Sequence, residues 1–476
     1  MFKEYNQKQN FLIPPSYDDF LWEKHQAKLL NNIINWLNLD FLYKSYNNTK
    51  LWTTAYNPVM LLKILFYWFM NNTFSSRKIA NKLKSDIWFM FLAWNNQPDF
   101  RTINNFRKNK WELLEKVFVQ IIMLAKEMWL IKFWTFSIDW TKIYANASKQ
   151  KNIDLERLQE KIGWLFDEAD RIDDLEDEEY WDNEDDIPQD LTDPEIFKTK
   201  LEKAKKKLKN LEKKAKEENN KLKENKQKTI NKINQTDSDS RLMQMKRKDY
   251  ANGYNCQIIT ENQFIIWNYI SNNPWDTKDL IPSIEKLKEN LKILPKNILA
   301  DKWYASEENY EYLEKHNIKS YIPHPESNLT NLINYNYDKK TDTYKDIEWN
   351  IFKFKQFMWN LTWGKRWRPK KWEWQKEDDF KAKLYYSILQ NWKKKYLYIA
   401  KNQKLVYKRN DKRLYSKKWQ KLFKTRSTEV ENPIWNIKFN LWFERFLLRW
   451  KNWVQIEWNL INMVHNLKKI MKILAS

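Results

Sequence analysis

Acidic side chains at the expected ends of two strands and on a later helix are the residues of this sequence best suited to chemistry. Asp139 lies in IKFWTFSIDWTKIYANA, whose β-branched and aromatic residues predict a strand. Asp301 ends a second strand in KNILADKWYAS, and Glu431 lies on a helix expected across Thr428–Asn440. Carboxylates placed in this way suit hard divalent cations, which in pairs support phosphoryl transfer.

Other kinds of catalytic site lack their residues. The sequence has no Gly-rich phosphate loop and no Gly-x-Ser-x-Gly elbow, even when tryptophan is read as glycine. Cys256 is the only cysteine, which excludes zinc sites built on several cysteines and fits a reducing, cytoplasmic setting. The four histidines have no metal-ligand spacing, and we interpret them as structural.

The charge balance predicts a polyanionic partner. Lys and Arg number 85 against 62 Asp and Glu, a formal net charge of +23. Such an excess favours nucleic acid through phosphate neutralisation and counterion release. The most apolar run, VMLLKILFYWFM, is short and contains Lys63, so we predict no membrane-spanning helix and no signal peptide.

Changes of character along the chain predict an α/β fold with an all-helical N-terminal region and two insertions. Apolar residues at helical spacing indicate a helical domain over 1–130. Strand and helix patterns assign a catalytic domain to 131–150, 236–325 and 426–476. An acidic block and a lysine-rich heptad helix predict a charged coiled-coil insertion at 151–235. A basic, aromatic, β-rich insertion is expected at 326–425.

Cations in a stretch of the N-terminal region that is expected to form two short helices joined by a turn are candidates for DNA contact. A helix-turn-helix would aim them at phosphates, whereas a solvated helical face explains the same charges equally well. The candidates are Arg77, Lys78, Lys82, Arg101, Arg107 and Lys108.

The contexts of the three acids resemble the DDE-type transposases of bacterial insertion sequences. The matching stretches are SIDWTKIYANASK, ILADKWYASEENYEYL and STEVENPIWNIKFNLWFERFLLRW, and PVMLLKILFYWFM, SSRKIA and PDFRTINNFRK resemble the family's DNA-binding region. The resemblance covers most of the chain outside 151–235 and parts of 326–425.

This resemblance implies an RNase H-like mixed sheet flanked by helices, with Asp139, Asp301 and Glu431 as catalytic metal ligands. It further implies two Mg²⁺ (or Mn²⁺) ions, cleavage at the element's terminal inverted repeats, and joining of the freed 3′-OH to target DNA. The partners would be double-stranded DNA and a second copy of the chain in a homodimer, in the cytoplasm with the nucleoid.

Further residues carry over with open alternatives. Lys438, seven residues after Glu431 and on the same face of an α-helix, resembles the lysine that contacts terminal DNA. The family usually has an arginine four residues before the Glu. That position is Ser427 in this sequence, and Arg426 is one position earlier. Glu429 is the rival of Glu431.

Three more side chains have two readings each. Asp237 and Asp239 are either alternative metal ligands or turn residues. Lys302, beside Asp301, either offsets phosphate charge or is an exposed lysine at a strand end. At the level of the whole chain, the alternatives are a catalytically inactive or domesticated DNA-binding protein and a structure-specific nuclease.

The glycine content is anomalous. Average usage of about 7% predicts roughly 33 glycines, whereas the sequence has 3 glycines and 28 tryptophans. Trp94, Trp275 and Trp303 stand where turns favour glycine. We hypothesise that the gene reads UGA as glycine and was translated with UGA as tryptophan. The alternative is a truly tryptophan-rich protein.

Overall fold

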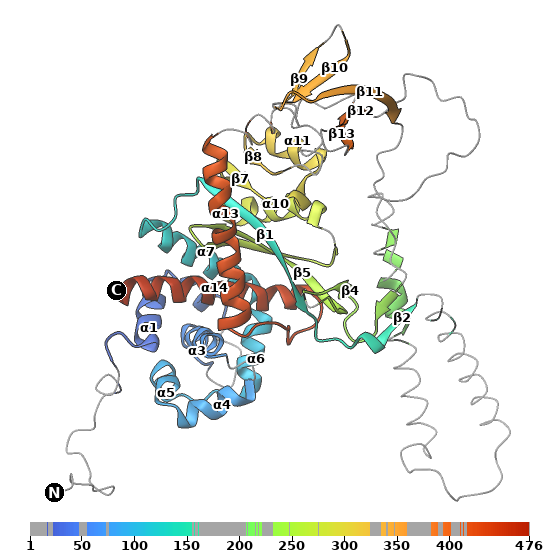
Figure 1. Ribbon diagram of the computed structural model, residues 1–476. Helices are drawn as coiled ribbons and strands as arrows, with labels where there is room; N and C mark the ends of the chain where they lie inside the picture. The colour runs from blue at the N-terminus through green and yellow to red at the C-terminus, as the bar shows by residue number, and fades with distance from the viewer. Residues whose placement is uncertain are drawn as a thin grey trace, which may run out of the picture.

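The computed structural model describes residues 22–46, 55–72, 76–154, 232–323 without 247 and 275, parts of 335–400, and 417–475, with isolated positions elsewhere. These residues form a mixed α/β structure in which the N-terminal helices pack at one end of a curled mixed sheet (Figure 1). The α/β class and the helical N-terminal region are therefore confirmed.

Short helices make up the N-terminal region. They are α1 (Gln26–Trp36), α2 (Asp40–Lys44), α3 (Pro58–Met70), α4 (Ser76–Ser85), α5 (Ile87–Ala93), α6 (Phe100–Asn109) and α7 (Trp111–Glu127). Helix α3 is buried almost all round, because its apolar residues cover nearly every face. It begins where Asn57 Oδ1 accepts hydrogen bonds from Val59 N and Met60 N. No helix in the described ranges is long and apolar enough to cross a membrane.

The main sheet has six strands with β1 at its centre. The strands are β1 (Thr135–Tyr144), β4 (Arg241–Gln244), β5 (Tyr250–Glu261), β6 (Phe264–Ser271), β7 (Asn297–Leu299) and β8 (Lys319–Tyr321). Strand β1 pairs antiparallel with β5 on one edge and parallel with β7 on the other. Strand β8 extends the parallel side, and β4 and β6 both pair with β5. The β5–β6 hairpin turns at Asn262 and Gln263, which both have positive φ.

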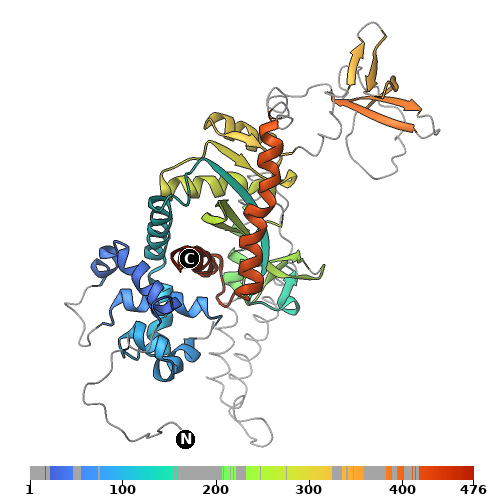
Figure 2. The same cartoon turned by 60° about the vertical axis from the view of Figure 1, so that its left-hand side comes forward.

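Helices cover both faces of this sheet. Helix α13 (Lys417–Trp435) crosses one face, and α14 (Lys451–Ala475) lies on the other face with α7 (Figure 2). Helices α10 (Leu280–Leu291) and α11 (Glu307–Lys315) follow β6 and β7 in the chain. The sheet is therefore the middle layer, and β1 lies directly under α13.

Both expected insertions begin and end near the main sheet. Strands β2 (Asn152–Asp154) and β3 (Lys232–Asn234) pair at the base of the first insertion. Most of 151–235 lies outside the described residues, but part of the predicted heptad helix is described: residues 208–214 are helical, with Leu208 and Leu211 buried. The partner helix of a coiled coil is not among them. In the second, β9 (Tyr335–Asp338), β10 (Thr343–Asp346), β11 (Ile351–Met358), β12 (Ala382–Ile388) and β13 (Lys394–Ala400) form an antiparallel sheet.

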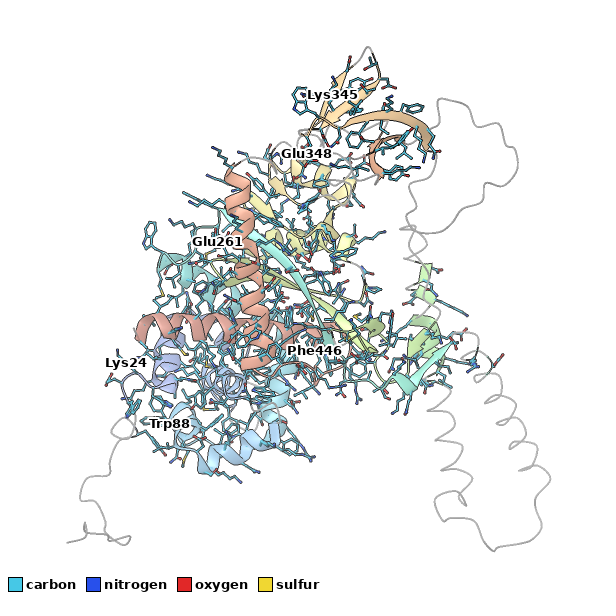
Figure 3. The ribbon with its side chains drawn as sticks, viewed as in Figure 1. Lys24, Trp88, Glu261, Lys345, Glu348 and Phe446 are labelled. Carbon is cyan, nitrogen blue, oxygen red and sulfur yellow. The ribbon has the colours of Figure 1, made fainter. Side chains whose placement is uncertain are left out.

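One carboxylate fixes the start of β1. The two oxygens of Glu261 accept hydrogen bonds from the backbone N–H groups of Lys132, Phe133, Trp134 and Thr135, at N···O distances of 2.6 to 3.1 Å. Charged acceptors strengthen such bonds, and they leave no orphan donors where the chain enters the sheet. Glu261 thus ties the end of β5 to the beginning of β1, at the edge where it is labelled in Figure 3.

Candidate active site

Asp139 lies in the middle of β1 and faces α13. Its Oδ2 is 3.2 Å from Arg426 Nη2, and both side chains are mostly buried. Burial raises the pKa of the Asp139 carboxyl to about 6, and the nearby Asp301 and Asp276 carboxylates add to this rise. Arg426 and the Trp140 N–H oppose it. Asp139 is therefore a carboxylate whose charge is only partly neutralised.

Asp301 lies beside Asp139 because of how β7 pairs with β1. In this parallel pair Ser137 is opposite Leu299, and each aspartate follows two residues later. Asp301 caps the single-turn 3₁₀ helix η5 (Lys302–Tyr304), and its Oδ1 accepts a hydrogen bond of 2.6 Å from Lys302 N. Strand pairing therefore brings together two acids that lie far apart in the sequence.

The structure separates Glu431 from its rival. Glu429 Oε2 accepts a hydrogen bond of 2.7 Å from Gln263 N at the β5–β6 turn, and burial raises the pKa of this carboxyl. Glu431 is exposed and lines a cavity of about 700 Å³ together with Asp139 and Lys438. Glu429 thus holds a turn, whereas Glu431 faces the space in front of Asp139.

Helix α13 differs from the expected helix at both ends. It begins at Lys417, well before Thr428, and ends at Trp435, where a π-helix, η9 (Asn436–Asn440), takes over. Lys438 is therefore not simply two α-helical turns beyond Glu431, although both line the same cavity. Lys438 Nζ donates a hydrogen bond of 3.0 Å to the Lys142 carbonyl, and burial lowers the pKa of its amine to about 8.

Two family models match the chain. Residues 15–109 match a transposase domain (DUF772), which covers α1 to α6, and residues 389–471 match a transposase DDE domain, which covers α13, η9 and most of α14. The chain therefore contains two transposase domains, which supports a DDE transposase of the insertion-sequence type. A search of curated proteins finds no match to it. The DDE match includes Glu431 but not Asp139 or Asp301, so the assignment of these two acids rests on β1 and β7.

The predicted DNA-binding cations of the transposase fall into two groups. Arg77 on α4 and Arg101 on α6 are exposed, and their guanidinium carbons lie 5.3 and 5.7 Å from the centre of the Phe100 ring. Lys78 is exposed on the same helix as Arg77, and Lys108 lies over the Trp453 ring. Arg77, Lys78 and Arg101 are therefore open to solvent, whereas Lys108 is half-buried.

Arg107 is different because it is buried. Only 4% of its surface is exposed, and its Nη1 lies 3.3 Å from Glu457 Oε1 on α14. Glu457 Oε2 also accepts hydrogen bonds from Leu447 N and Leu448 N. Arg107 therefore joins the helical region to α14 instead of facing DNA.

Asp237 and Asp239 hold the start of α14. Asp237 Oδ1 accepts hydrogen bonds from Tyr254 Oη (2.8 Å) and Trp450 N (3.1 Å), and Asp239 Oδ2 accepts one from Lys451 N (2.9 Å). Carboxylates at a helix N-terminus satisfy otherwise free N–H groups. These contacts are those of structural acids.

Lys302 lies beside Asp301, but its side chain is exposed, and Nζ is 5.4 Å from the centre of the Trp303 ring. Across the part of the transposase that the structure describes, no three His, Cys, Asp or Glu side chains come together closely enough to hold a metal ion. Asp139 and Asp301 are the pair of predicted ligands whose charges interact.

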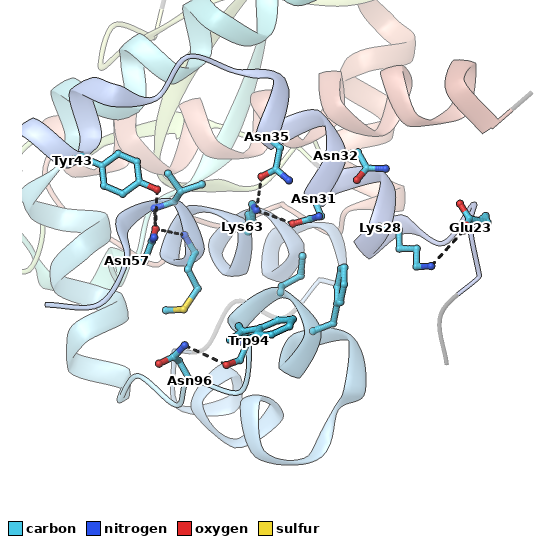
Figure 4. A pocket seen from close by; sticks show the side chains of 14 residues that line it. Glu23, Lys28, Asn31, Asn32, Asn35, Tyr43, Asn57, Lys63, Trp94 and Asn96 are labelled. Carbon is cyan, nitrogen blue, oxygen red and sulfur yellow. Dashed lines mark hydrogen bonds and ion pairs between the residues drawn. The ribbon is translucent and has the colours of Figure 1, made fainter. Parts of the chain in front are cut away.

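A larger cavity of about 930 Å³ lies in the helical region, away from these acids (Figure 4). Lys63 Nζ donates hydrogen bonds of 2.7 Å to Asn31 Oδ1 and Asn35 Oδ1 on its wall. Its lining contains amides and few ionised groups. Glu23 is the one carboxylate among its lining residues, and it pairs with Lys28. The cavity therefore offers hydrogen bonding and not a cluster of acids.

His465 makes the stability of the folded protein depend on pH. It is buried between η9 and the β5–β6 turn, with Nδ1 2.9 Å from Asn436 Nδ2 and Nε2 2.9 Å from the Gln263 carbonyl. Burial lowers the pKa of its imidazole from 6.5 to about 4. Below pH 6.5 the His465 imidazole therefore binds a proton in the unfolded chain but stays neutral in the folded chain. The free energy of unfolding consequently falls as the pH falls from about 6.5 to about 4.

We predict that the free energy of unfolding of the wild type drops by about 3 kcal/mol more than that of His465→Gln between about pH 7 and pH 4. Urea unfolding of both proteins across this range measures the difference. Because other groups titrate equally in both, the variant is its own control. Parallel pH profiles would show that His465 is not held neutral.

Proposed function

We propose that this transposase cleaves DNA at the ends of its element and joins the freed 3′-OH to target DNA, with Asp139, Asp301 and Glu431 as the catalytic acids. The observation that carries the proposal is the meeting of three separate segments: Asp139 on β1 interacts with Asp301 after β7, and Glu431 on α13 lines the same cavity as Asp139. A mixed sheet with a helix over its central strand supports an RNase H-like catalytic fold.

Divalent metal ions fit this pair of carboxylates. Asp139 and Asp301 offer the oxygen ligands that Mg²⁺ and Mn²⁺ prefer, and Mg²⁺ keeps several waters, so it needs few side chains. The raised pKa of Asp139 supports the fit, because a cation at this position would relieve the negative charge that Arg426 leaves unbalanced. Two ions held by these acids and Glu431 would supply the charge that activates the attacking oxygen and stabilises the leaving oxygen.

The chain's own side chains orient DNA around this point. Arg426 holds Asp139 in place, and Lys142, Lys246, Lys248 and Lys438 line the same cavity, where they can contact phosphates. We also propose contacts from Lys302, beside Asp301, and, in the helical region, from Arg77, Lys78, Arg101 and Lys108, all of them outside the buried core. Arg107 is left out of this set because it is buried against Glu457.

The remaining assignments follow from this function. We assign DNA binding to 1–130, catalysis to 131–150, 236–325 and 426–476, and accessory roles to the insertions at 151–235 and 326–425. The active complex would be a homodimer bound to both terminal inverted repeats, in the cytoplasm with the nucleoid. Two DNA ends that react together are the reason to expect two copies.

The rival glutamates give the sharpest test of the site. We expect Asp139→Asn and Glu431→Gln each to slow Mg²⁺-dependent cleavage by on the order of 10²- to 10³-fold, the loss seen when one preorganised group is removed. Glu429→Gln, two residues away on the same helix, should keep the wild-type rate. The measurement is cleavage of labelled DNA that carries the sequences flanking the gene.

Two results would contradict the proposal in different ways. A slow Glu429→Gln variant beside a fast Glu431→Gln variant would exchange the roles of the two glutamates. Salt-dependent DNA binding with no cleavage by the wild type would instead indicate a catalytically inactive DNA-binding protein.

A further inference from the structure

A buried polar network lies beneath the loop that carries Asp301. Tyr304 is fully buried, and its hydroxyl donates a hydrogen bond to Gln257 Oε1 on β5. Gln257 Nε2 lies 3.5 Å from Asp276 Oδ1 and 3.4 Å from Asp279 Oδ2. Asn255 Nδ2 donates a shorter bond of 2.6 Å to Asp276 Oδ1. The loop after Asp301 is therefore tied through one tyrosine to two carboxylates and two amides.

These two carboxylates are too enclosed to act as ordinary surface acids. Asp276 is 7% exposed and Asp279 is 1% exposed. Burying a carboxylate is costly unless hydrogen bonds replace the lost water, and here Asn255, Gln257 and Asn273 donate to them. The donors to these two carboxylates restrict the geometry of the network, while Asn255 Oδ1 has no hydrogen-bond partner among the described residues. Gln257 is thereby fixed with its oxygen toward Tyr304.

Tyr304 is coupled to Asp301 through a single turn of 3₁₀ helix. Tyr304 N donates a hydrogen bond of 3.0 Å to the Asp301 carbonyl, and Asp301 caps the same turn. The backbone of this turn is also held from the side: Thr277 Oγ1 bonds the Trp303 carbonyl at 3.0 Å, and Asn309 Nδ2 bonds the Tyr304 carbonyl at 2.7 Å. A shift of the tyrosine would therefore move the aspartate.

We propose that Tyr304 is a positioning residue that holds Asp301 beside Asp139, with Gln257, Asp276 and Asp279 as its buried support. This inference rests on the proposed function, because it assumes that Asp301 binds metal. The role of the two buried aspartates is then to fix the loop, not to bind the ion. Removing a group that orients a metal ligand typically lowers metal affinity or activity by about 10- to 100-fold.

Tyr304→Phe tests this inference because it removes one hydroxyl and keeps the ring. The matched control is Tyr310→Phe: Tyr310 is also fully buried, and its hydroxyl donates to the Ile322 carbonyl at 2.9 Å outside the network. Mn²⁺ binding to the full chain, followed by electron paramagnetic resonance without DNA, is the direct readout. We expect Tyr304→Phe to weaken Mn²⁺ binding by about 10-fold or more, and Tyr310→Phe to leave it unchanged.

Two companion variants separate the possible failures. Thr277→Val removes only the side-chain bond to the Trp303 carbonyl, and we expect it to weaken Mn²⁺ binding as well. It tests the same loop if Tyr304→Phe does not fold. Equal Mn²⁺ binding by wild type, Tyr304→Phe and Thr277→Val, with loss of binding in Asp301→Asn, would overturn the positioning role and leave the proposed function standing. Wild-type Mn²⁺ binding by Asp301→Asn would overturn both.

The conformations of the tryptophans carry a second, independent inference. Among the described residues, fourteen that are not glycine have positive φ, and five of these are tryptophans. At 28 tryptophans in 476 residues, fewer than one would be expected. The five are Trp94, Trp129, Trp349, Trp442 and Trp450, with φ between 46° and 67°. A left-handed conformation strains a bulky side chain and is natural for glycine.

The hydrogen bonds around two of them are those of glycine C-caps. After α5, Asn95 N donates to the Met90 carbonyl across Trp94, and after α7, Leu130 N donates to the Ala125 carbonyl across Trp129, both at 3.0 Å. This pattern defines the Schellman motif, whose left-handed position is usually glycine. All five indoles are exposed, from 41% at Trp450 to 83% at Trp129. Trp450 contacts the Trp453 ring edge-on, whereas the other four indoles are at least 74% exposed and bury little surface.

The geometry points to glycine at these five positions in the native protein, which supports the reading of UGA as glycine. The structure does not extend this to every tryptophan. Trp458 is fully buried, and its indole N–H donates to the Gln257 carbonyl at 3.4 Å. Trp303 lies in the η5 turn without positive φ, and Trp275 lies outside the described residues.

Peptide mass mapping of the protein isolated from its own cells decides the matter. We expect glycine at the five positions and tryptophan at Trp458, which serves as the internal control. Tryptophan at Trp94 and Trp129 would overturn the inference. In recombinant protein, Trp94→Gly should raise the urea concentration at the midpoint of unfolding, because the left-handed strain is relieved.

Discussion

The ion pair between Asp139 and Arg426 is the contact on which the arrangement of the site depends. It joins the central strand of the sheet to the helix that carries Glu431, across an interface where both side chains are mostly buried. Removing one partner of such a pair would leave an uncompensated charge in a poor solvent for ions. This pair fixes α13 over β1 together with the bonds of Glu429 to Gln263 N and of Lys438 to the Lys142 carbonyl, and the position of Glu431 follows from these contacts.

The strand under this pair is itself fixed by other charged groups. Glu261 holds the start of β1 through four backbone N–H groups, and the Arg107–Glu457 pair joins the helical region to α14 behind the sheet. At its far end, Tyr144 exchanges backbone hydrogen bonds with the segment before α14. The acidic site therefore lies where the layers are held together by buried charges, and a rigid frame favours precise placement of metal ligands.

The sequence predicts the strands better than the contacts between them. Alternating β-branched and aromatic residues indicate the strand around Asp139, and the apolar run before Asp301 indicates β7; the structure contains both. The pairing of Asp139 with Arg426 could not be predicted, because the arginine is one position from its expected place and only the packing of α13 shows its partner. Arg107 could not be distinguished from Arg101 either, since charge gives no sign of a buried partner on a distant helix.

The same limit applies to the support of Asp301. Asp276 and Asp279 look like ordinary loop acids in NNPWDTKDL, and their amide partners come from β5. Local patterns also place the start of the helix that carries Glu431 too late, at Thr428 and not at Lys417. In addition, the π-helix at Asn436–Asn440 breaks the helical spacing on which the expectation for Lys438 relied. What remains predictable from sequence is the set of elements, while the network that holds them is a property of the assembled fold.

The most direct test of the account is the position of Mn²⁺ in crystals of the transposase bound to DNA from the end of its element, located by anomalous scattering. The account predicts a peak within ligand distance of both Asp139 and Asp301, in the cavity that Glu431 lines. A peak held by Asp276 and Asp279, or by Asp237 and Asp239, with none at Asp139, would contradict it.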